Sequence, residues 1–204
     1  MTPAGRIGPG PEATPEAVVV LVGLMGSGKS TVGRLVAERW GCPFVDLDRE
    51  IERLSGLSIA EIFRTEGEAG FRRREAAATL GLLPNPPLVI AVGGGWMACP
   101  ELRGAWPGAV RVWLRVPPAE AARRLAGADS DRPLLAEGAV EERLASLLAA
   151  RLPAYGLADY TVDASDRTPE EVARVVAGLF EGGRARPAGP AGPDDNDQAD
   201  HVET

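Results

Sequence analysis

Apolar and polar residues alternate along this chain with two different periods. Short β-branched and apolar runs predict buried strands at residues 18–22, 43–46, 88–92, 109–116 and 160–163. Between these runs the apolar positions recur at helical spacing, which predicts helices at residues 32–40, 58–63, 68–82, 140–152 and from 169, with another that opens at 117–120. Strands that alternate with helices are typical of a parallel sheet covered on both faces. The pattern predicts a three-layer α/β/α fold with a five-stranded parallel sheet.

Two of the predicted helices carry start signals in the sequence. Ser58 and Glu61 have the spacing of a capping box. Thr168 and Glu171 repeat this spacing, and Pro169 stands at the first helical position between them. We therefore expect these two helices to begin directly after Ser58 and Thr168.

The two ends of the chain differ from the alternating region. Residues 1–16 are rich in Pro and Gly, and residues 183–204 are rich in Pro, Gly and Asp. This composition predicts two disordered arms around a single domain at 17–182.

Within the domain, residues 126–137 are polar and contain glycine, so we expect a mobile lid there. With 204 residues, 45% of them hydrophobic, the chain can bury one substantial core.

The charge of the chain is concentrated in its acidic C-terminal arm. Residues 187–204 hold five acidic residues and neither Lys nor Arg. The net charge is −7 for the whole chain and −2 when this segment is left out. A nearly neutral domain gives no reason to expect nucleic-acid binding.

The two cysteines, Cys42 and Cys99, lack any motif spacing, and no apolar run of the chain is long enough to cross a bilayer. We expect a cytoplasmic monomer that binds no membrane and carries no signal peptide.

The single histidine of the chain is His201, in the acidic arm. A catalytic centre in the domain therefore cannot use Ser-His-Asp, Cys-His or His-rich zinc chemistry.

Residues 23–31 read Gly-Leu-Met-Gly-Ser-Gly-Lys-Ser-Thr and lie between the first predicted strand and helix. In this setting the pattern G-x-x-x-x-G-K-[ST] binds the phosphates of a nucleotide. The glycines let backbone N–H groups point at a phosphate, and the helix N-terminus adds partial positive charge. Lys29 adds a full charge, and the Ser30 hydroxyl can bind Mg²⁺. We expect the nucleotide to contact Gly26, Ser27, Gly28, Lys29, Ser30 and Thr31.

Lys29 is the only lysine among 22 basic residues, and all the others are arginine. A point charge on a flexible stem can follow a moving phosphoryl group better than a planar guanidinium can. The lone lysine at the phosphate position therefore indicates that its geometry matters.

The rest of the chain narrows the class of nucleotide-binding protein. A GTPase reads guanine with an Asn-Lys-x-Asp motif, for which this chain has no second lysine. The third predicted strand ends in Gly93-Gly94-Gly95 and has no acidic residue that could act as a Walker-B acid. Simple ATP hydrolysis is therefore disfavoured, and a kinase for a small acceptor remains.

Asp46 and Asp48 follow the second predicted strand, where open α/β sheets bind ligands. One carboxylate there can orient the waters of Mg²⁺, and a second can accept the proton of an acceptor hydroxyl. This pair favours a kinase as well.

Several motifs together resemble those of the shikimate kinase family, and the resemblance covers nearly all of residues 17–182. Besides the phosphate loop with Gly33, they are Asp46-Leu47-Asp48, Ser58 to Phe63, Gly67-Glu68, Phe71-Arg72-Arg73-Arg74-Glu75, Gly93-Gly94-Gly95, Arg132-Pro133-Leu134-Leu135, Arg151 with Pro153 and Tyr155, and Val162-Asp163. Many families share the phosphate loop, but few share the whole set.

The resemblance implies transfer of the γ-phosphate of ATP to the 3-hydroxyl of shikimate, a step of aromatic amino acid synthesis, with Mg²⁺ as cofactor. It implies that Asp48 contacts the acceptor hydroxyls as base or orienter, and that Asp46 supports Mg²⁺ through water beside Ser30. Arg72 and Arg151 would clamp the shikimate carboxylate, since guanidinium groups bind carboxylates bidentately.

Further residues of the acceptor site follow from the same resemblance. Glu75 comes one turn after Arg72 and is placed to hold its guanidinium. Gly93, Gly94 and Gly95 would bring backbone N–H groups close to the substrate. The run of arginines at 72–74 cannot all face one way on a helix, so at most two of them should enter the site.

The nucleotide side gains three residues from the resemblance. Arg132 corresponds to the lid arginine that closes on the phosphates, and we expect it to act in catalysis with Lys29 and Asp48. A closing lid keeps water from the transferring group. Arg124 and Pro169 match positions that flank the adenine.

Two residues depart from the family pattern. Thr79 stands where the family usually has an aliphatic residue, and Trp96 is bulky for a position near the substrate. Two alternative functions stay open from sequence: a P-loop kinase for gluconate or a nucleoside monophosphate, and a nucleotide-binding regulatory protein without turnover. The retained Lys29, Ser30, acidic pair and Arg132 argue against the second alternative, because an idle site need not keep both the lid and the base.

Overall fold

The structure is a computed structural model that describes residues 16–126 and 140–180. The expected terminal arms, apart from residue 16, and nearly all of the expected lid, including Arg132, lie outside these ranges. The described elements are β1 (Val18–Val22), α1 (Lys29–Trp40), β2 (Phe44–Asp46), α2 (Leu47–Ser55), α3 (Ile59–Gly81), β3 (Leu88–Ala91), α4 (Pro100–Gly104), β4 (Val110–Arg115), α5 (Pro118–Ala126), α6 (Val140–Tyr155), β5 (Tyr160–Asp163) and α7 (Pro169–Gly178).

The five strands form one parallel sheet in the order β2-β3-β1-β4-β5. The central strand β1 is buried along its whole length, as its uninterrupted apolar sequence predicts. Ala91 of β3 pairs with Leu21 of β1 on one side and with Asp46 of β2 on the other. The carboxyl ends of these three strands therefore meet at one edge of the sheet, which brings the phosphate loop, the acidic pair and the triple glycine together.

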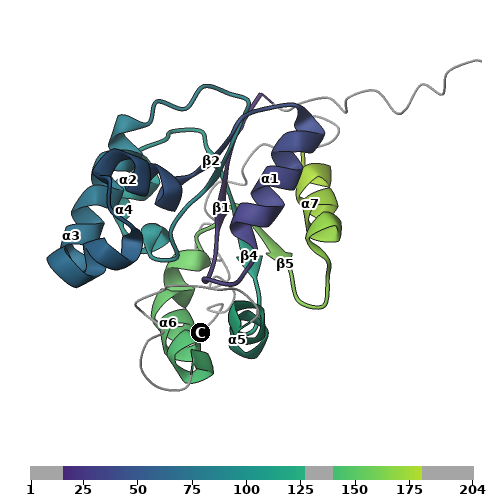
Figure 1. The fold of residues 1–204 in the computed structure, drawn as a ribbon. Helices are drawn as coiled ribbons and strands as arrows, with labels where there is room; N and C mark the ends of the chain where they lie inside the picture. Colours follow the sequence, from purple (N-terminus) through teal and green to yellow (C-terminus); the bar gives the residue numbers. More distant parts are fainter. Residues whose placement is uncertain (1–15, 127–139, 181–204) are drawn as a thin grey trace, which may run out of the picture.

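Alternate residues of β1 face two separate cores, which makes the fold three-layered. Val19 and Leu21 pack with α1, α5 and α7, whereas Val18, Val20 and Val22 pack with α2, α3 and α4. Figure 1 shows α1 and α7 on one side of the sheet and α2, α3 and α4 on the other. The predicted α/β/α architecture with five parallel strands is confirmed.

The structure corrects the prediction between the acidic pair and the third strand. Residues Leu47–Ser55 form a helix, α2, which was not predicted from the sequence. The predicted helices 58–63 and 68–82 are two parts of α3, which meet at Gly67, where φ is 68° and ψ is −174°. Both capping boxes are present as predicted. A 3₁₀ turn, Trp96–Ala98, and α4 follow the triple glycine and were also not predicted.

Helix α6 continues past Pro153 to Tyr155, whereas the sequence predicted an end at residue 152. Proline removes one backbone donor, but the helix still gains a 2.9 Å bond from Gly156 N–H to the Leu152 carbonyl. The extra turn matters because it brings Tyr155 onto the same helix face as Arg151. No helix among the described residues is long and apolar enough to span a membrane.

Candidate active site

The phosphate loop joins β1 to α1 and ends at Gly28, the residue before the helix. Gly28 has φ 91°, a left-handed conformation that a residue with a side chain rarely adopts. No side chain caps the start of α1, so its first N–H groups face the loop. Lys29 Nζ donates to the carbonyl oxygens of Gly23, at 2.9 Å, and Leu24, at 2.8 Å. The loop therefore presents an ammonium group and a helix N-terminus, a combination suited to phosphate.

Asp46 connects the phosphate loop to α2. The Ser30 hydroxyl donates a 2.6 Å hydrogen bond to Asp46 Oδ2. Asp46 Oδ1 accepts the backbone N–H groups of Asp48, at 3.2 Å, and Arg49, at 3.4 Å, and so caps α2. Because Asp46 begins the helix, Asp48 lies in its first turn, near the phosphate loop.

A cavity of about 660 Å³ opens beside the phosphate loop. Its lining includes the predicted residues Gly26, Ser27, Gly28, Lys29, Ser30, Thr31, Asp46, Asp48, Arg124 and Pro169. Four further charged residues of the lining were not predicted from the sequence: Glu120, Arg123, Asp166 and Arg167.

Glu120 holds the two arginines of α5 at the cavity. Arg124 Nε donates to Glu120 at 2.6 Å, and Arg123 makes two bonds of 2.8 Å to the same carboxylate. Arg124 also donates to the Ala164 carbonyl at 2.7 Å, which ties α5 to the segment after β5. Helical spacing of three and four residues was a signal in the sequence that could have identified Glu120.

The triple glycine lies against four charged side chains. A Cβ atom on Gly93 would lie 2.6 Å from Glu75 Oε1 and 3.3 Å from Asp48 Oδ1. A Cβ on Gly94 would lie 2.9 Å from Arg151 Nη1 and 3.4 Å from the Gly23 carbonyl oxygen.

The third glycine, Gly95, lies against Arg72, where an added Cβ would lie 2.7 Å from the guanidinium carbon Cζ. Each of the three glycines thus lets a different set of polar groups approach the backbone. The four predicted acceptor-site side chains Asp48, Arg72, Glu75 and Arg151 meet at this segment.

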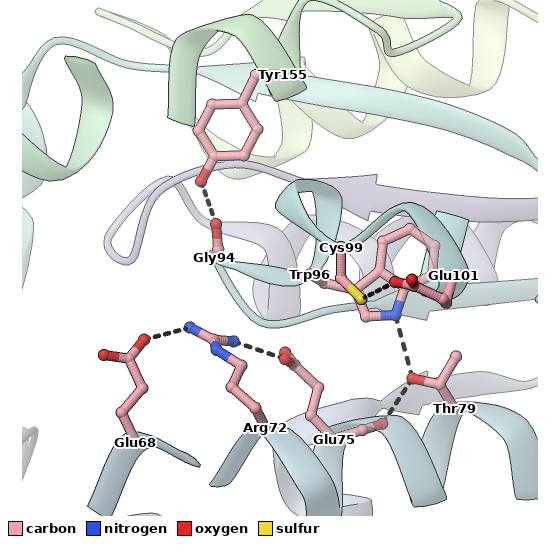
Figure 2. Close-up of polar contacts among 9 residues, drawn as sticks. All are labelled: Glu68, Arg72, Glu75, Thr79, Gly94, Trp96, Cys99, Glu101 and Tyr155. Atoms are coloured by element: carbon pink, nitrogen blue, oxygen red, sulfur yellow. Dashed lines mark hydrogen bonds and ion pairs between the residues drawn. The ribbon is translucent and has the colours of Figure 1, made fainter. Parts of the chain in front are cut away.

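Arg72 and Glu75 form an ion pair that faces the glycines. Arg72 Nη1 donates to Glu75 Oε2 at 2.6 Å, and Arg72 Nη2 donates to Glu68 at 3.2 Å (Figure 2). Burial raises the pKa of Glu75, and the nearby guanidinium of Arg72 opposes this rise. Burial acts to lower the pKa of Arg72, but the two carboxylates raise it above its ordinary value.

This cluster includes a buried acceptor and a buried donor that lack a hydrogen-bond partner within the part of the chain that the structure describes. They are Glu75 Oε1, on a side chain that is 1% exposed, and Arg151 Nη1, on a residue that is 9% exposed. A buried acceptor or donor without a partner lowers the stability of the fold. A ligand hydroxyl could donate to the Glu75 oxygen, and a ligand carboxylate could accept from the Arg151 guanidinium.

The arginine run of α3 splits as its helical spacing requires. Arg72 faces the glycines, Arg73 is exposed, and Arg74 pairs with Glu66 at 2.6 Å. One arginine of the three therefore reaches the triple glycine.

Tyr155 lies at the triple glycine, and no role was predicted for it from the sequence. Its hydroxyl donates a 2.6 Å hydrogen bond to the Gly94 carbonyl (Figure 2). Its ring stacks on Trp113 with centroids 5.5 Å apart. Tyr155 fixes the middle glycine, and burial raises the pKa of its hydroxyl, which therefore stays protonated as a donor.

The sequence left open how the bulky Trp96 affects the acceptor site, and the structure shows that this side chain is fully buried. Its side chain is 0% exposed and packs behind the glycines, where its indole N–H donates to Thr79 Oγ1 at 3.1 Å. The two departures from the family pattern therefore contact each other. Sequence spacing gives no signal for this contact, which joins residues 17 positions apart.

Metal ligation must rely on few protein groups here. Within residues 16–126 and 140–180, no three His, Cys, Asp or Glu side chains gather as a metal site. The Ser30 and Asp46 oxygens at the cavity wall suit a cation that keeps most of its waters and binds phosphate oxygens, as Mg²⁺ does.

Comparison with known proteins places these features in one family. The family model described as "Shikimate kinase" matches residues 25–179. A shikimate kinase of Paramagnetospirillum magneticum is 44% identical over 179 residues, which cover 87% of each chain. One of Thermobifida fusca is 44% identical over 161 residues, with 78% of this chain and 92% of the relative covered.

Solved structures agree with the sequence comparisons. A shikimate kinase from Acinetobacter baumannii in complex with shikimate has a TM-score of 0.76 and 38% identity, and the match covers 82% of this chain and 93% of that one. A shikimate kinase from Aquifex aeolicus has a TM-score of 0.65 and 33% identity, with 78% and 93% of the two chains covered.

Proposed function

Because this chain belongs to the shikimate kinase family, we propose that it phosphorylates the 3-hydroxyl of shikimate with ATP. The products are shikimate 3-phosphate and ADP. The observation that carries this proposal is the position of Asp48, which lines the cavity at the phosphate loop and also faces Gly93 beside Glu75. A carboxylate at this junction can reach both a bound nucleotide and an acceptor held by the arginines.

The nucleotide binds with its phosphates at the start of α1. Lys29 and the N–H groups of the loop hold the β- and γ-phosphates, and Arg124 and Pro169 flank the base. Ser30 would hold Mg²⁺ directly, and Asp46 would support it through water. Mg²⁺ held by these residues would offset the negative charge that develops during transfer.

The acceptor binds against the triple glycine. Arg72 and Arg151 hold its carboxylate, and Glu75 keeps the Arg72 guanidinium in position. Asp48 accepts the proton of the 3-hydroxyl while that oxygen forms a bond to the γ-phosphorus. The bond between the γ-phosphorus and the β–γ bridging oxygen breaks, and the electron pair leaves with ADP.

The lid and the cellular setting belong to this proposal as well. Arg132, in the expected lid, would approach the transferring phosphoryl group, where a guanidinium stabilises the charge of the transition state. We further propose that the enzyme acts as a cytoplasmic monomer, without a nucleic-acid or membrane partner.

The proposal is tested by offering shikimate, gluconate and nucleoside monophosphates side by side with ATP and Mg²⁺. ADP release is followed by a coupled assay, and the phosphorylated product is identified by mass spectrometry. Of these acceptors, we expect only shikimate to be phosphorylated. We expect Lys29→Met to abolish this activity. Turnover with gluconate or a nucleoside monophosphate but not with shikimate would refute the proposed substrate. ATP binding without any turnover would favour a regulatory protein.

A further inference from the structure

Two tryptophans attach the C-terminal half of α3 to the segment that follows the triple glycine. Trp96 Nε1 donates to Thr79 Oγ1, and Trp106 Nε1 donates to the Leu82 carbonyl, each at 3.1 Å. The two indoles stack with centroids 5.4 Å apart and an angle of 21° between their planes. The end of α3 away from the acceptor site is therefore held at two points.

Thr79 links Trp96 to the residue that holds the acceptor arginine. Its hydroxyl accepts the indole N–H and donates its own proton to the Glu75 carbonyl at 2.8 Å (Figure 2). Trp96 and Thr79 are 0% exposed, and Glu75 is 1% exposed. Water cannot replace these partners, so loss of either bond leaves a buried polar group without one.

The contacts close a ring through the glycine segment. The Trp96 backbone N–H donates to the Gly93 carbonyl at 3.1 Å, and Gly93 lies against Glu75 Oε1. The ring thus runs from Gly93 to Trp96, on to Thr79 and Glu75, and back to Gly93. Its size sets the separation between α3 and the triple glycine.

We infer that Thr79 and Trp96 are positioning residues for the acceptor site. Their hydrogen bond fixes the position of α3 relative to the triple glycine, so that Glu75 lies against Gly93 and Arg72 against Gly95. This inference rests on the proposed function, because the carboxylate of the acceptor is the group that the arginine would hold. The approach of Arg72 to Gly95 leaves no room for a methyl group, so a small shift of α3 moves the guanidinium relative to its ligand.

The test uses the full chain with the variants Thr79→Val, Thr79→Ser, Trp96→Phe and the Thr79→Val/Trp96→Phe double variant. Thr79→Val keeps the shape and removes the hydroxyl, whereas Trp96→Phe keeps a stacking ring and removes the N–H group. We expect each to raise the KM for shikimate about three- to tenfold, the equivalent of one hydrogen bond, with the KM for ATP unchanged. Thr79→Ser keeps the hydroxyl and should retain the wild-type KM for shikimate. The double variant should show no more than the larger single effect, because both changes break the bond between Trp96 and Thr79.

Trp106→Phe is the matched control, since it removes the other indole N–H bond to α3 without touching Thr79 or Glu75. It should lower the melting temperature and leave the KM for shikimate at the wild-type value. An equal rise of this KM in Trp106→Phe would overturn the inference in favour of general packing.

The inference can fail while the proposed function holds. Wild-type turnover of shikimate, together with an unchanged shikimate KM in Thr79→Val and Trp96→Phe, would overturn the inference alone. Absence of wild-type turnover would overturn both. If Thr79→Val does not fold, as circular dichroism would reveal, the KM of Trp96→Phe decides.

Discussion

The Ser30 hydroxyl and Asp46 Oδ2 lie 2.6 Å apart and join the phosphate loop to the end of β2. The same carboxylate caps α2, the helix that carries Asp48. One aspartate therefore couples the site proposed for the cation to the position of the proposed base. This arrangement brings the two halves of the reaction within one small region at the edge of the sheet.

Asp46→Asn should raise the Mg²⁺ concentration for half-maximal rate about tenfold, because the metal loses a supporting charge. Asparagine still caps the helix, so the melting temperature should change little. Steady-state rates over a Mg²⁺ titration measure the effect. Asp163→Asn, at the end of β5 and paired with Arg115, is the control, and its titration should match the wild type. Equal curves for both variants would contradict the role of Asp46.

Asp48→Ala should lower kcat by about 10²–10⁴-fold, the usual contribution of a general base. ATP affinity should stay near the wild-type value, since Lys29 and the loop are unchanged. Calorimetric titration with an ATP analogue and a coupled rate assay separate the two effects. Glu50→Ala is the control, because this residue lies in the same first turn and pairs with the exposed Arg53. A normal kcat in Asp48→Ala would refute the assignment of the base.

Arg72→Ala should raise the KM for shikimate about 10- to 100-fold, in keeping with charge-assisted hydrogen bonds of about 1.5–3 kcal/mol. The KM for ATP should not change. Arg74→Ala is the control, because Arg74 lies on the same helix and pairs with Glu66. If both variants show the same small rise, Arg72 does not hold the carboxylate.

Gly95→Ala should also raise the KM for shikimate, because the new methyl group would meet the Arg72 guanidinium, whose Cζ would be 2.7 Å away. The backbone itself permits alanine, since Gly95 has φ −97°. Gly104→Ala adds the same group where nothing lies within 4 Å and serves as the control. Parallel kinetics of the two variants test the prediction. A wild-type KM in Gly95→Ala would show that the guanidinium has room to move.

Glu75 should make both activity and stability depend on pH, because burial raises its pKa above the ordinary value of 4.5. As the pH falls through the raised pKa, Glu75 takes up a proton and loosens its hold on Arg72, so kcat/KM for shikimate should fall. Between the ordinary and the raised pKa the folded state binds the proton more strongly than the unfolded state does. The free energy of unfolding should therefore decrease as the pH rises through this window.

Glu75→Gln provides the comparison for both pH measurements. In this variant kcat/KM for shikimate should no longer fall at acidic pH. The free energy of unfolding, measured by urea denaturation at several pH values, should no longer decrease as the pH rises through this window. Profiles of the variant that retain the wild-type slopes would assign the dependence to another group.

Short-range signals predicted most of the secondary structure. The apolar runs marked all five strands, and the capping boxes at Ser58 and Thr168 marked two helix starts. Helix α2 was missed although its signals were present: Asp46 caps its start, and Gly56 ends it in a left-handed conformation. The strand and the helix follow each other without a break, and this continuity hid the boundary.

The sequence by itself determined the phosphate loop, the parallel α/β sheet and the family, because these depend on spacing between near neighbours in the chain. Tertiary structure alone decided which side chain each of the three glycines faces. It also decided that Trp96 is fully buried and donates a hydrogen bond to Thr79. Such contacts join residues far apart in sequence, and their geometry depends on how β3, α3 and α6 pack around the edge of the sheet.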